Sequence, residues 1–121
     1  MKRLIRAATA AVVVVAGYGV VASPANATGA SGCPWPYVCF YTMAGFYKGT
    51  PVAMYKDITA SWQYLGTGRG AAVVYNARND DGARVHTTNG KAYCVRPNEY
   101  FWPSRSRLTV DRVQIVDSPT C

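Results

Sequence analysis

Four cysteines constrain the fold of this chain more than any other feature. They are Cys33, Cys39, Cys94 and Cys121 in a sequence of 121 residues. In a small exported chain an even number of cysteines predicts disulfides, which add stability that a small core lacks. Four cysteines allow three pairings, and the sequence leaves all three open. We expect Cys33–Cys39 and Cys94–Cys121, because the Pro-Trp-Pro bend over residues 34–36 would bring the first two cysteines close together.

Residues 1–27 have the organisation of a secretory signal peptide. Three basic residues precede an apolar run over residues 7–22, and the small residues Ala25 and Ala27 follow it. This order predicts cleavage after Ala27. A membrane anchor is the less favoured alternative, because the run is shorter than the roughly 20 residues that span a bilayer. We therefore expect a signal peptide over residues 1–27 and a secreted β domain over residues 28–121, with no membrane span after processing.

The charge of the chain is positive but dispersed. There are 13 Lys and Arg against six Asp and Glu, a formal net charge of +7. Three of the basic residues lie in residues 1–27, and the others are scattered singly apart from Arg105 and Arg107. A nucleic-acid-binding protein would gather such residues on one element. We expect a solvated basic surface, a monomer and no nucleic-acid partner, while attraction to an anionic cell wall or an acidic partner stays open.

The pattern beyond residue 36 is typical of an all-β domain. Short segments rich in Val, Tyr, Phe and Thr alternate with Gly, Pro, Asn and Asp clusters. Strands are expected over residues 37–42, 52–55, 72–78, 83–87, 91–96 and 108–116. Turns at Asp81-Gly82 and Asn89-Gly90 would make residues 72–96 a meander of three strands.

Two segments interrupt this pattern. Residues 57–65 have apolar residues at helical spacing behind a capping aspartate, which predicts one short helix. Residues 108–116 change their alternation at Asp111-Arg112, which predicts a bulge or pairing in two different sheets.

Residues that could catalyse a reaction or bind a metal are few. His86 is the only histidine, so a zinc site with four protein ligands would need three of the cysteines. Its alternation with Val85 places His86 on the solvent side of a strand. Asp80 and Asp81 are adjacent, but a turn is the ordinary place for such a pair. The sequence therefore predicts a protein that is not an enzyme and has no cofactor or metal site.

The order of cysteines and aromatic residues resembles a family of small secreted actinobacterial proteins. Residues 33–41 (Cys-Pro-Trp-Pro-Tyr-Val-Cys-Phe-Tyr), then Phe46, Gly49, residues 72–76 (Ala-Val-Val-Tyr-Asn) and Cys94, are similar to peptidase inhibitor family I36. The resemblance implies a small Greek-key β-sandwich, similar to βγ-crystallin domains, with two disulfides and at most one short helix. It also implies a secreted hydrolase as the partner, above all a thermolysin-like metalloprotease.

Two features depart from the βγ-crystallin pattern. The spacing from Phe46 to Gly49 is one residue longer than in the crystallin Greek key. The crystallin calcium motif is half met in residues 56–61, and residues 79–82 lack its hydroxyl groups. Calcium prefers about six to eight oxygen ligands. We therefore expect no calcium site.

Two neighbouring segments are candidates for the inhibitory surface. Cys94-Val95 resembles the reactive site of the family, in which Val95 would fill an apolar pocket and the disulfide would hold the loop rigid. The alternative for this dipeptide is that it ends a core strand. The second segment is an aromatic run before a proline, which would anchor a partner if exposed. The candidate binding residues are Cys94, Val95, Arg96, Tyr100, Phe101 and Trp102.

Other functions stay open. Residues 62–64 (Trp-Gln-Tyr) resemble the Trp-Arg-Tyr triplet of the streptomycete α-amylase inhibitors, with glutamine in place of the charged residue. A wall-binding or glycan-binding module would use Trp62 and Trp102 as platforms for sugar rings. An antimicrobial or structural protein without an enzyme target is the last alternative.

Overall fold

The computed structural model describes residues 30–121, so the predicted signal peptide and its cleavage site lie outside the described residues. The helical elements are η1 (Ala30–Gly32), α1 (Met43–Lys48) and η2 (Pro103–Ser106). The strands are β1 (Val38–Tyr41), β2 (Ala53–Tyr55), β3 (Gln63–Tyr64), β4 (Val73–Asn76), β5 (Ala83–Thr87), β6 (Ala92–Val95), β7 (Tyr100–Phe101) and β8 (Val110–Ile115). Within residues 30–121 no helix is both long and apolar enough to cross a membrane.

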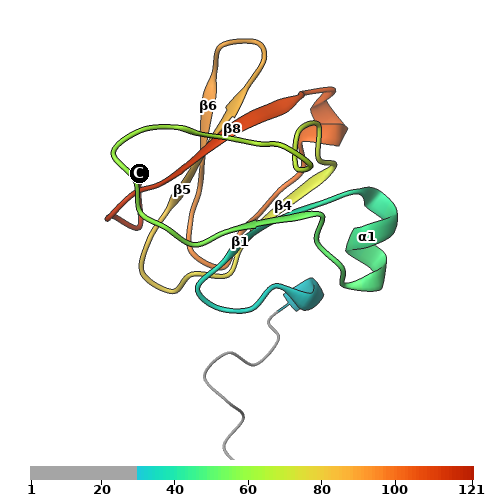
Figure 1. Ribbon diagram of the computed structural model, residues 1–121, viewed down its shortest axis with the longest axis horizontal. Coiled ribbons are helices and arrows are strands. Elements are labelled where there is room, and N and C mark those ends of the chain that lie inside the picture. The colour runs from blue at the N-terminus through green and yellow to red at the C-terminus, as the bar shows by residue number, and fades with distance from the viewer. Residues whose placement is uncertain (1–29) are drawn as a thin grey trace, which may run out of the picture.

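The strands form two antiparallel sheets that pack into a β-sandwich (Figure 1). The first sheet has the order β2-β1-β4-β7, and the second has the order β3-β8-β5-β6. The main core contains buried side chains from both sheets, such as Phe40, Val74, Val85 and Val113. The all-β prediction with very little helix is therefore confirmed.

Strand β1 shows how alternation produces two apolar layers. Its residues Val38 and Phe40 belong to the core between the sheets, while Cys39 and Tyr41 belong to a second cluster on the outer face of the first sheet. All four residues are buried. Successive side chains of a strand point to opposite faces. The outer face of this sheet is therefore also covered, and α1 lies beside one end of β1 (Figure 1).

Both predicted disulfides are confirmed. Cys33–Cys39 and Cys94–Cys121 each join Cα atoms 5.9 Å apart. The first connects the segment before β1 to the outer face of the first sheet, where both cysteines are buried. The second connects β6 to the last residue, and a Cβ built on Gly82 would lie 2.7 Å from the Cys121 Sγ atom. Gly82 is therefore required for this close approach.

The predicted meander over residues 72–96 is wrong. Strand β4 lies in the first sheet and β5 in the second, so the Asp81-Gly82 segment carries the chain between sheets. Of the three strands in this segment, only β5 and β6 form a hairpin, and its turn contains Gly90 with a φ of 85°. The crossing is held by polar side chains of residues 76–81 rather than by a tight hairpin turn.

The predicted helix over residues 57–65 is also wrong. Ile58 forms a bridge with Ile115, and the two residues of β3 pair with β8, so this segment pairs with the neighbouring strand instead of forming helical hydrogen bonds. The helix that does form is α1. Thr42 caps it by accepting a hydrogen bond from the Gly45 amide, and Gly49 ends it in the left-handed region.

The predicted bulge in the last strand is confirmed. His86 pairs with Arg112 while Thr87 pairs with Val110, so Asp111 is the extra residue on β8. The bulge explains why the apolar alternation changes phase at this point.

Tyr41 gives the fold a predicted sensitivity to alkali. Burial raises the pKa of its hydroxyl above the usual value near 10, with smaller contributions from Tyr100 and Tyr75. The folded state therefore keeps a proton that the unfolded chain loses above about pH 10. This stabilisation is complete below that pH and is lost as the pH rises further, at up to about 1.4 kcal/mol per pH unit. Urea unfolding between pH 9 and pH 11 should show this fall.

The matched variant is Tyr41→Phe. It loses the hydrogen bond to the Ser31 carbonyl oxygen, 2.9 Å away, which should cost about 1 kcal/mol at pH 7. Above pH 10 its free energy of unfolding should decline less steeply than that of the wild type. Equal slopes in the two proteins would contradict the role of Tyr41.

Candidate functional site

The structure separates the predicted binding residues into two groups. Cys94 and Val95 end β6 in the second sheet, whereas Tyr100 and Phe101 form β7 in the first. Arg96 is exposed in the turn between them, where its amide donates to the Glu99 carboxylate. The six residues therefore do not make one continuous surface.

Val95 occupies the interior of the protein. Its side chain is 2% exposed and packs in the main core, and β6 pairs it with Ala83. Its carbonyl oxygen accepts a hydrogen bond from the Asn76 side chain at 2.9 Å. The expectation that Val95 enters a pocket of a partner is therefore corrected, because the side chain already fills a pocket of its own protein. Cys94 is exposed but is held in its disulfide.

The predicted aromatic run divides between the two faces of the first sheet. Phe101 pairs with Val74 and packs against the main core, where its ring stacks on Tyr93 with centroids 5.0 Å apart. Tyr100 pairs with Tyr75 on the outer face, and Trp102 packs against the cluster on that face. Alternation along β7 therefore directs Tyr100 outward and Phe101 inward.

Helix α1 brings two more aromatic rings to the same outer face. The Phe46 ring lies 5.8 Å from Tyr100, 5.0 Å from Trp102 and 5.7 Å from Tyr47, between ring centroids. All three contacts have the edge-to-face geometry that aromatic pairs favour. We call Phe46, Tyr47, Tyr100 and Trp102 the aromatic patch.

The aromatic patch is partly open to solvent. Tyr47 is 78% exposed and Tyr100 is 38% exposed, while Phe46 and Trp102 are half-buried. The Arg105 guanidinium lies 4.1 Å from the centre of the Trp102 ring, and Lys48 is exposed at the end of α1. The patch therefore combines apolar rings with a basic edge.

Several contacts hold the aromatic patch rigid. The Tyr100 ring stacks on Tyr75, with centroids 4.3 Å apart, and burial raises the pKa of the Tyr75 hydroxyl. Pro103 is buried at the start of η2, and the next residue, Ser104, donates a hydrogen bond to the Ala72 carbonyl oxygen at 2.9 Å. Tyr100 and Trp102 are therefore held in place before any partner arrives, which lowers the entropy cost of binding.

Phe46 and Tyr47 were not among the predicted binding residues. The sequence carries a local signal for their helix, since Thr42 is a good N-cap and Gly49 a good terminator. It carries no signal for the contact between α1 and β7, which are about fifty residues apart in the chain.

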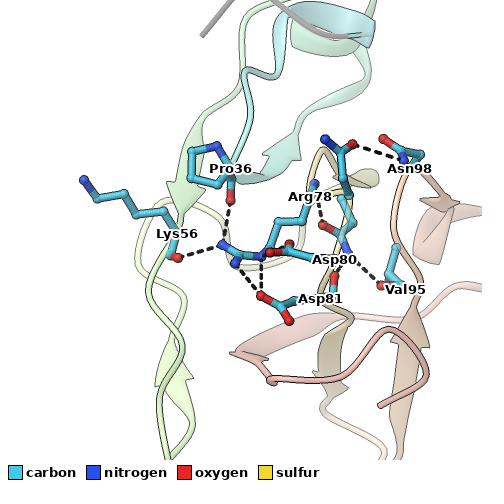
Figure 2. A network of polar contacts seen from close by, with 9 residues as sticks. Pro36, Lys56, Arg78, Asp80, Asp81, Val95 and Asn98 are labelled. Atoms are coloured by element: carbon cyan, nitrogen blue, oxygen red, sulfur yellow. Dashed lines mark hydrogen bonds and ion pairs between the residues drawn. The ribbon is translucent and has the colours of Figure 1, made fainter. Parts of the chain in front are cut away.

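A second cluster of polar groups lies at the crossing between the sheets. Arg78 is 7% exposed, and its guanidinium donates to Asp81 and to the carbonyl oxygens of Pro36 at 3.2 Å and Lys56 at 3.1 Å (Figure 2). Asn76 donates to the backbone oxygens of Asp81 and Val95. The cluster joins the loop before β1, the segment after β2 and the crossing itself, which is a structural role.

The acidic residues of this crossing give a prediction about calcium. Asp81 bonds to Arg78, and Asp80 lies 3.4 Å from the same guanidinium. A cation would have to displace this arginine, so calorimetric titration should show no calcium binding tighter than about 1 mM. Within residues 30–121 no group of three or more His, Cys, Asp or Glu side chains is placed to hold a metal ion. A micromolar site would show instead that backbone carbonyls complete a calcium shell at Asp80 or Asp57.

Comparisons of the chain with protein-family models, with curated proteins and with solved structures gave no match.

Proposed function

We propose that this protein is a secreted inhibitor of a protease and that it binds its target through the aromatic patch. A thermolysin-like metalloprotease is the expected target, on the resemblance of residues 33–41 and 72–76 to peptidase inhibitor family I36. The observation that carries the proposal is the aromatic patch itself, in which Phe46 contacts each of the other three rings and Tyr47 and Tyr100 are exposed. Such ordered rings on a surface are typical of sites that bind another protein.

The proposed mechanism is occupation of the substrate cleft by a rigid surface. Exposed rings of the patch would enter apolar subsites of the protease, and the basic edge would meet solvent or acidic groups at the rim. The backbone under the patch is hydrogen-bonded to β4 in β7 and helical in α1, so these segments are not free to enter the protease as a substrate strand. The substrate is then excluded while the inhibitor stays intact.

We further propose that the protein acts by binding and not by catalysis. His86 contacts Asp111 through its Nδ1 atom at 2.5 Å, and its ring makes an edge-to-face contact with Trp62 at 5.5 Å between centroids. This arrangement fits a structural pair on the outer face of the second sheet. The predicted Greek-key likeness to βγ-crystallins belongs to the same proposal and rests on the sequence resemblance.

Inhibition assays with a panel of secreted hydrolases test the proposal. The processed protein should inhibit thermolysin at micromolar concentration or below and leave subtilisin and α-amylase active. Trp102→Ala should weaken inhibition by roughly 30-fold to 1000-fold, because removing an aromatic anchor costs about 2 to 4 kcal/mol of binding. Circular dichroism and thermal melting establish that the variant is folded.

Two exposed tyrosines on opposite faces provide a matched control. Tyr47 belongs to the aromatic patch, whereas Tyr64 lies on the second sheet and is 73% exposed. Tyr47→Ala should weaken inhibition, and Tyr64→Ala should leave it unchanged. Inhibition that survives both Trp102→Ala and Tyr47→Ala would reject the patch as the contact surface. A wild-type protein that leaves thermolysin-like enzymes fully active would reject the inhibitor function.

A further inference from the structure

The outer face of the second sheet carries a different set of side chains. Tyr64 of β3, Arg112 of β8 and His86 of β5 pair in one row across the sheet. Arg84 pairs with Gln114 in the next row, two residues along the same strands. Side chains two residues apart lie on the same face of a strand, roughly 7 Å apart. This face is on the opposite side of the sandwich from the aromatic patch.

Each arginine of this face lies against an aromatic ring. The Arg84 guanidinium carbon is 4.8 Å from the centre of the Trp62 ring, and the Arg112 guanidinium carbon is 4.9 Å from the centre of the Tyr64 ring. Stacking on a ring holds the plane of a guanidinium while its edges stay available for hydrogen bonds. We call Trp62, Tyr64, Arg84 and Arg112 the arginine face.

The two guanidiniums have more donors than the described residues use. Arg84 donates one hydrogen bond, from Nη1 to the Gln114 Oε1 atom at 3.0 Å. The Arg112 Nε atom lies 3.7 Å from an Asp111 oxygen and, within residues 30–121, has no hydrogen-bond partner. Asp111 uses its other oxygen for His86. A guanidinium has five N–H donors. The buried Arg112 Nε is out of reach of a ligand, but the Nη donors of Arg112 and four of the five donors of Arg84 have no partner within residues 30–121.

Asp111 contacts both Arg112 and His86, so this carboxylate is already shared, while Arg84 bonds to the neutral Gln114 side chain. A ligand that complements a guanidinium is a planar anion such as a carboxylate, because its two oxygens accept two parallel N–H hydrogen bonds. Trp62 is half-buried, but Tyr64 is largely exposed and offers a flat ring beside the arginines. A flat ring packs well against the C–H face of a sugar ring.

Nucleic acid suits the arginine face less well than a carboxylated sugar, because the other basic residues of the chain are dispersed.

We propose that the arginine face binds an acidic polysaccharide whose sugars carry carboxylates. The guanidiniums of Arg84 and Arg112 receive the carboxylates, and Tyr64, which lies beside Arg112 at the edge of the sheet, packs against a sugar ring of the same polymer. The inference goes beyond the proposed inhibition and does not depend on it, since the two surfaces lie on different sheets. A polymer held at the arginine face leaves the aromatic patch open for a protease.

Binding to polygalacturonate tests the proposal. Affinity electrophoresis and calorimetry at about 0.15 M salt, where charges beyond roughly 8 Å are screened, should show binding to this polymer and none to neutral dextran. Arg112→Gln and Arg84→Gln should each weaken binding about tenfold, since each removes a charge-assisted contact. Arg112→Lys keeps the charge but loses the planar fork, and it should also weaken binding.

The matched control is Arg105→Gln. It removes the same charge from the same kind of ring–guanidinium contact, at Trp102 on the opposite face. It should leave polygalacturonate binding unchanged, whereas Tyr64→Ala should weaken it. Equal losses of polygalacturonate affinity in Arg84→Gln, Arg112→Gln and Arg105→Gln would overturn the proposal, because they would show that binding depends only on the net charge of the protein. Equally tight binding to duplex DNA, or no polygalacturonate binding by the wild type, would also overturn it.

Discussion

Replacing Arg78 with methionine is expected to lower the free energy of unfolding by about 3 to 5 kcal/mol. The guanidinium is buried and holds Asp81, the Pro36 carbonyl and the Lys56 carbonyl at once (Figure 2). Methionine fills part of the space but leaves the Asp81 carboxylate buried without its partner. Removing one member of a buried ion pair costs more than the pair itself contributes, because the remaining charge is uncompensated.

Urea denaturation at pH 7 measures this loss as a lower midpoint. Arg96→Met is the matched control, because Arg96 is exposed and its replacement should change the free energy of unfolding by less than about 0.5 kcal/mol. The double variant Arg78→Met with Asp81→Leu should be more stable than Arg78→Met alone, since no charge is left buried. A loss below about 1 kcal/mol in Arg78→Met would show that water reaches the site and replaces the guanidinium.

The sequence patterns that predicted strands correctly are those in which local and tertiary demands agree. Residues 83–87 alternate between buried and half-buried positions, as expected for a strand with one face in the core. The pairings Cys33–Cys39 and Cys94–Cys121 were also predictable, the first from the proline bend between its cysteines. Inner strands covered on both faces, such as β1, still followed from their Val, Phe and Tyr content.

The failures arose where tertiary contacts override local preference. Residues 57–65 have helical spacing, but Gln63 and Tyr64 pair with β8 instead. The Asp81-Gly82 dipeptide suits a tight turn, yet the buried side chains of Asn76 and Arg78 hold a longer crossing there. No local sequence pattern predicts that Arg78 is buried, because its partners come from three separate segments of the chain.

The candidate site was predictable only in part. Tyr100 and Trp102 were selected from the sequence, and the division of the aromatic run between two faces follows from alternation once β7 is recognised. A strand of two residues is too short for that pattern to be read along the chain. Phe46 and Tyr47 join the patch because α1 packs beside β7. Val95 is not part of the candidate surface, because its side chain points into the core between the sheets.

Val95→Asp is expected to destabilise the protein by roughly 3 to 5 kcal/mol, because it places an unpaired charge among apolar side chains. The side chain at this position is 2% exposed and contacts the core between the sheets. Ala92→Asp is the matched control, since it puts the same group at an exposed position of the same strand. Thermal unfolding should show a large loss for Val95→Asp and a small one for Ala92→Asp.

The same pair of variants separates the two surfaces first considered for inhibition. If Val95 is a core residue, the Val95→Asp protein loses inhibition only to the extent that it unfolds, and the folded fraction keeps its affinity. If Val95 were the contact residue, the variant would fold as stably as Ala92→Asp and still fail to inhibit. A stable, inactive Val95→Asp protein would therefore return the reactive site to β6, whereas an unstable one leaves Tyr100 and Trp102 as the predicted aromatic residues that can reach a partner.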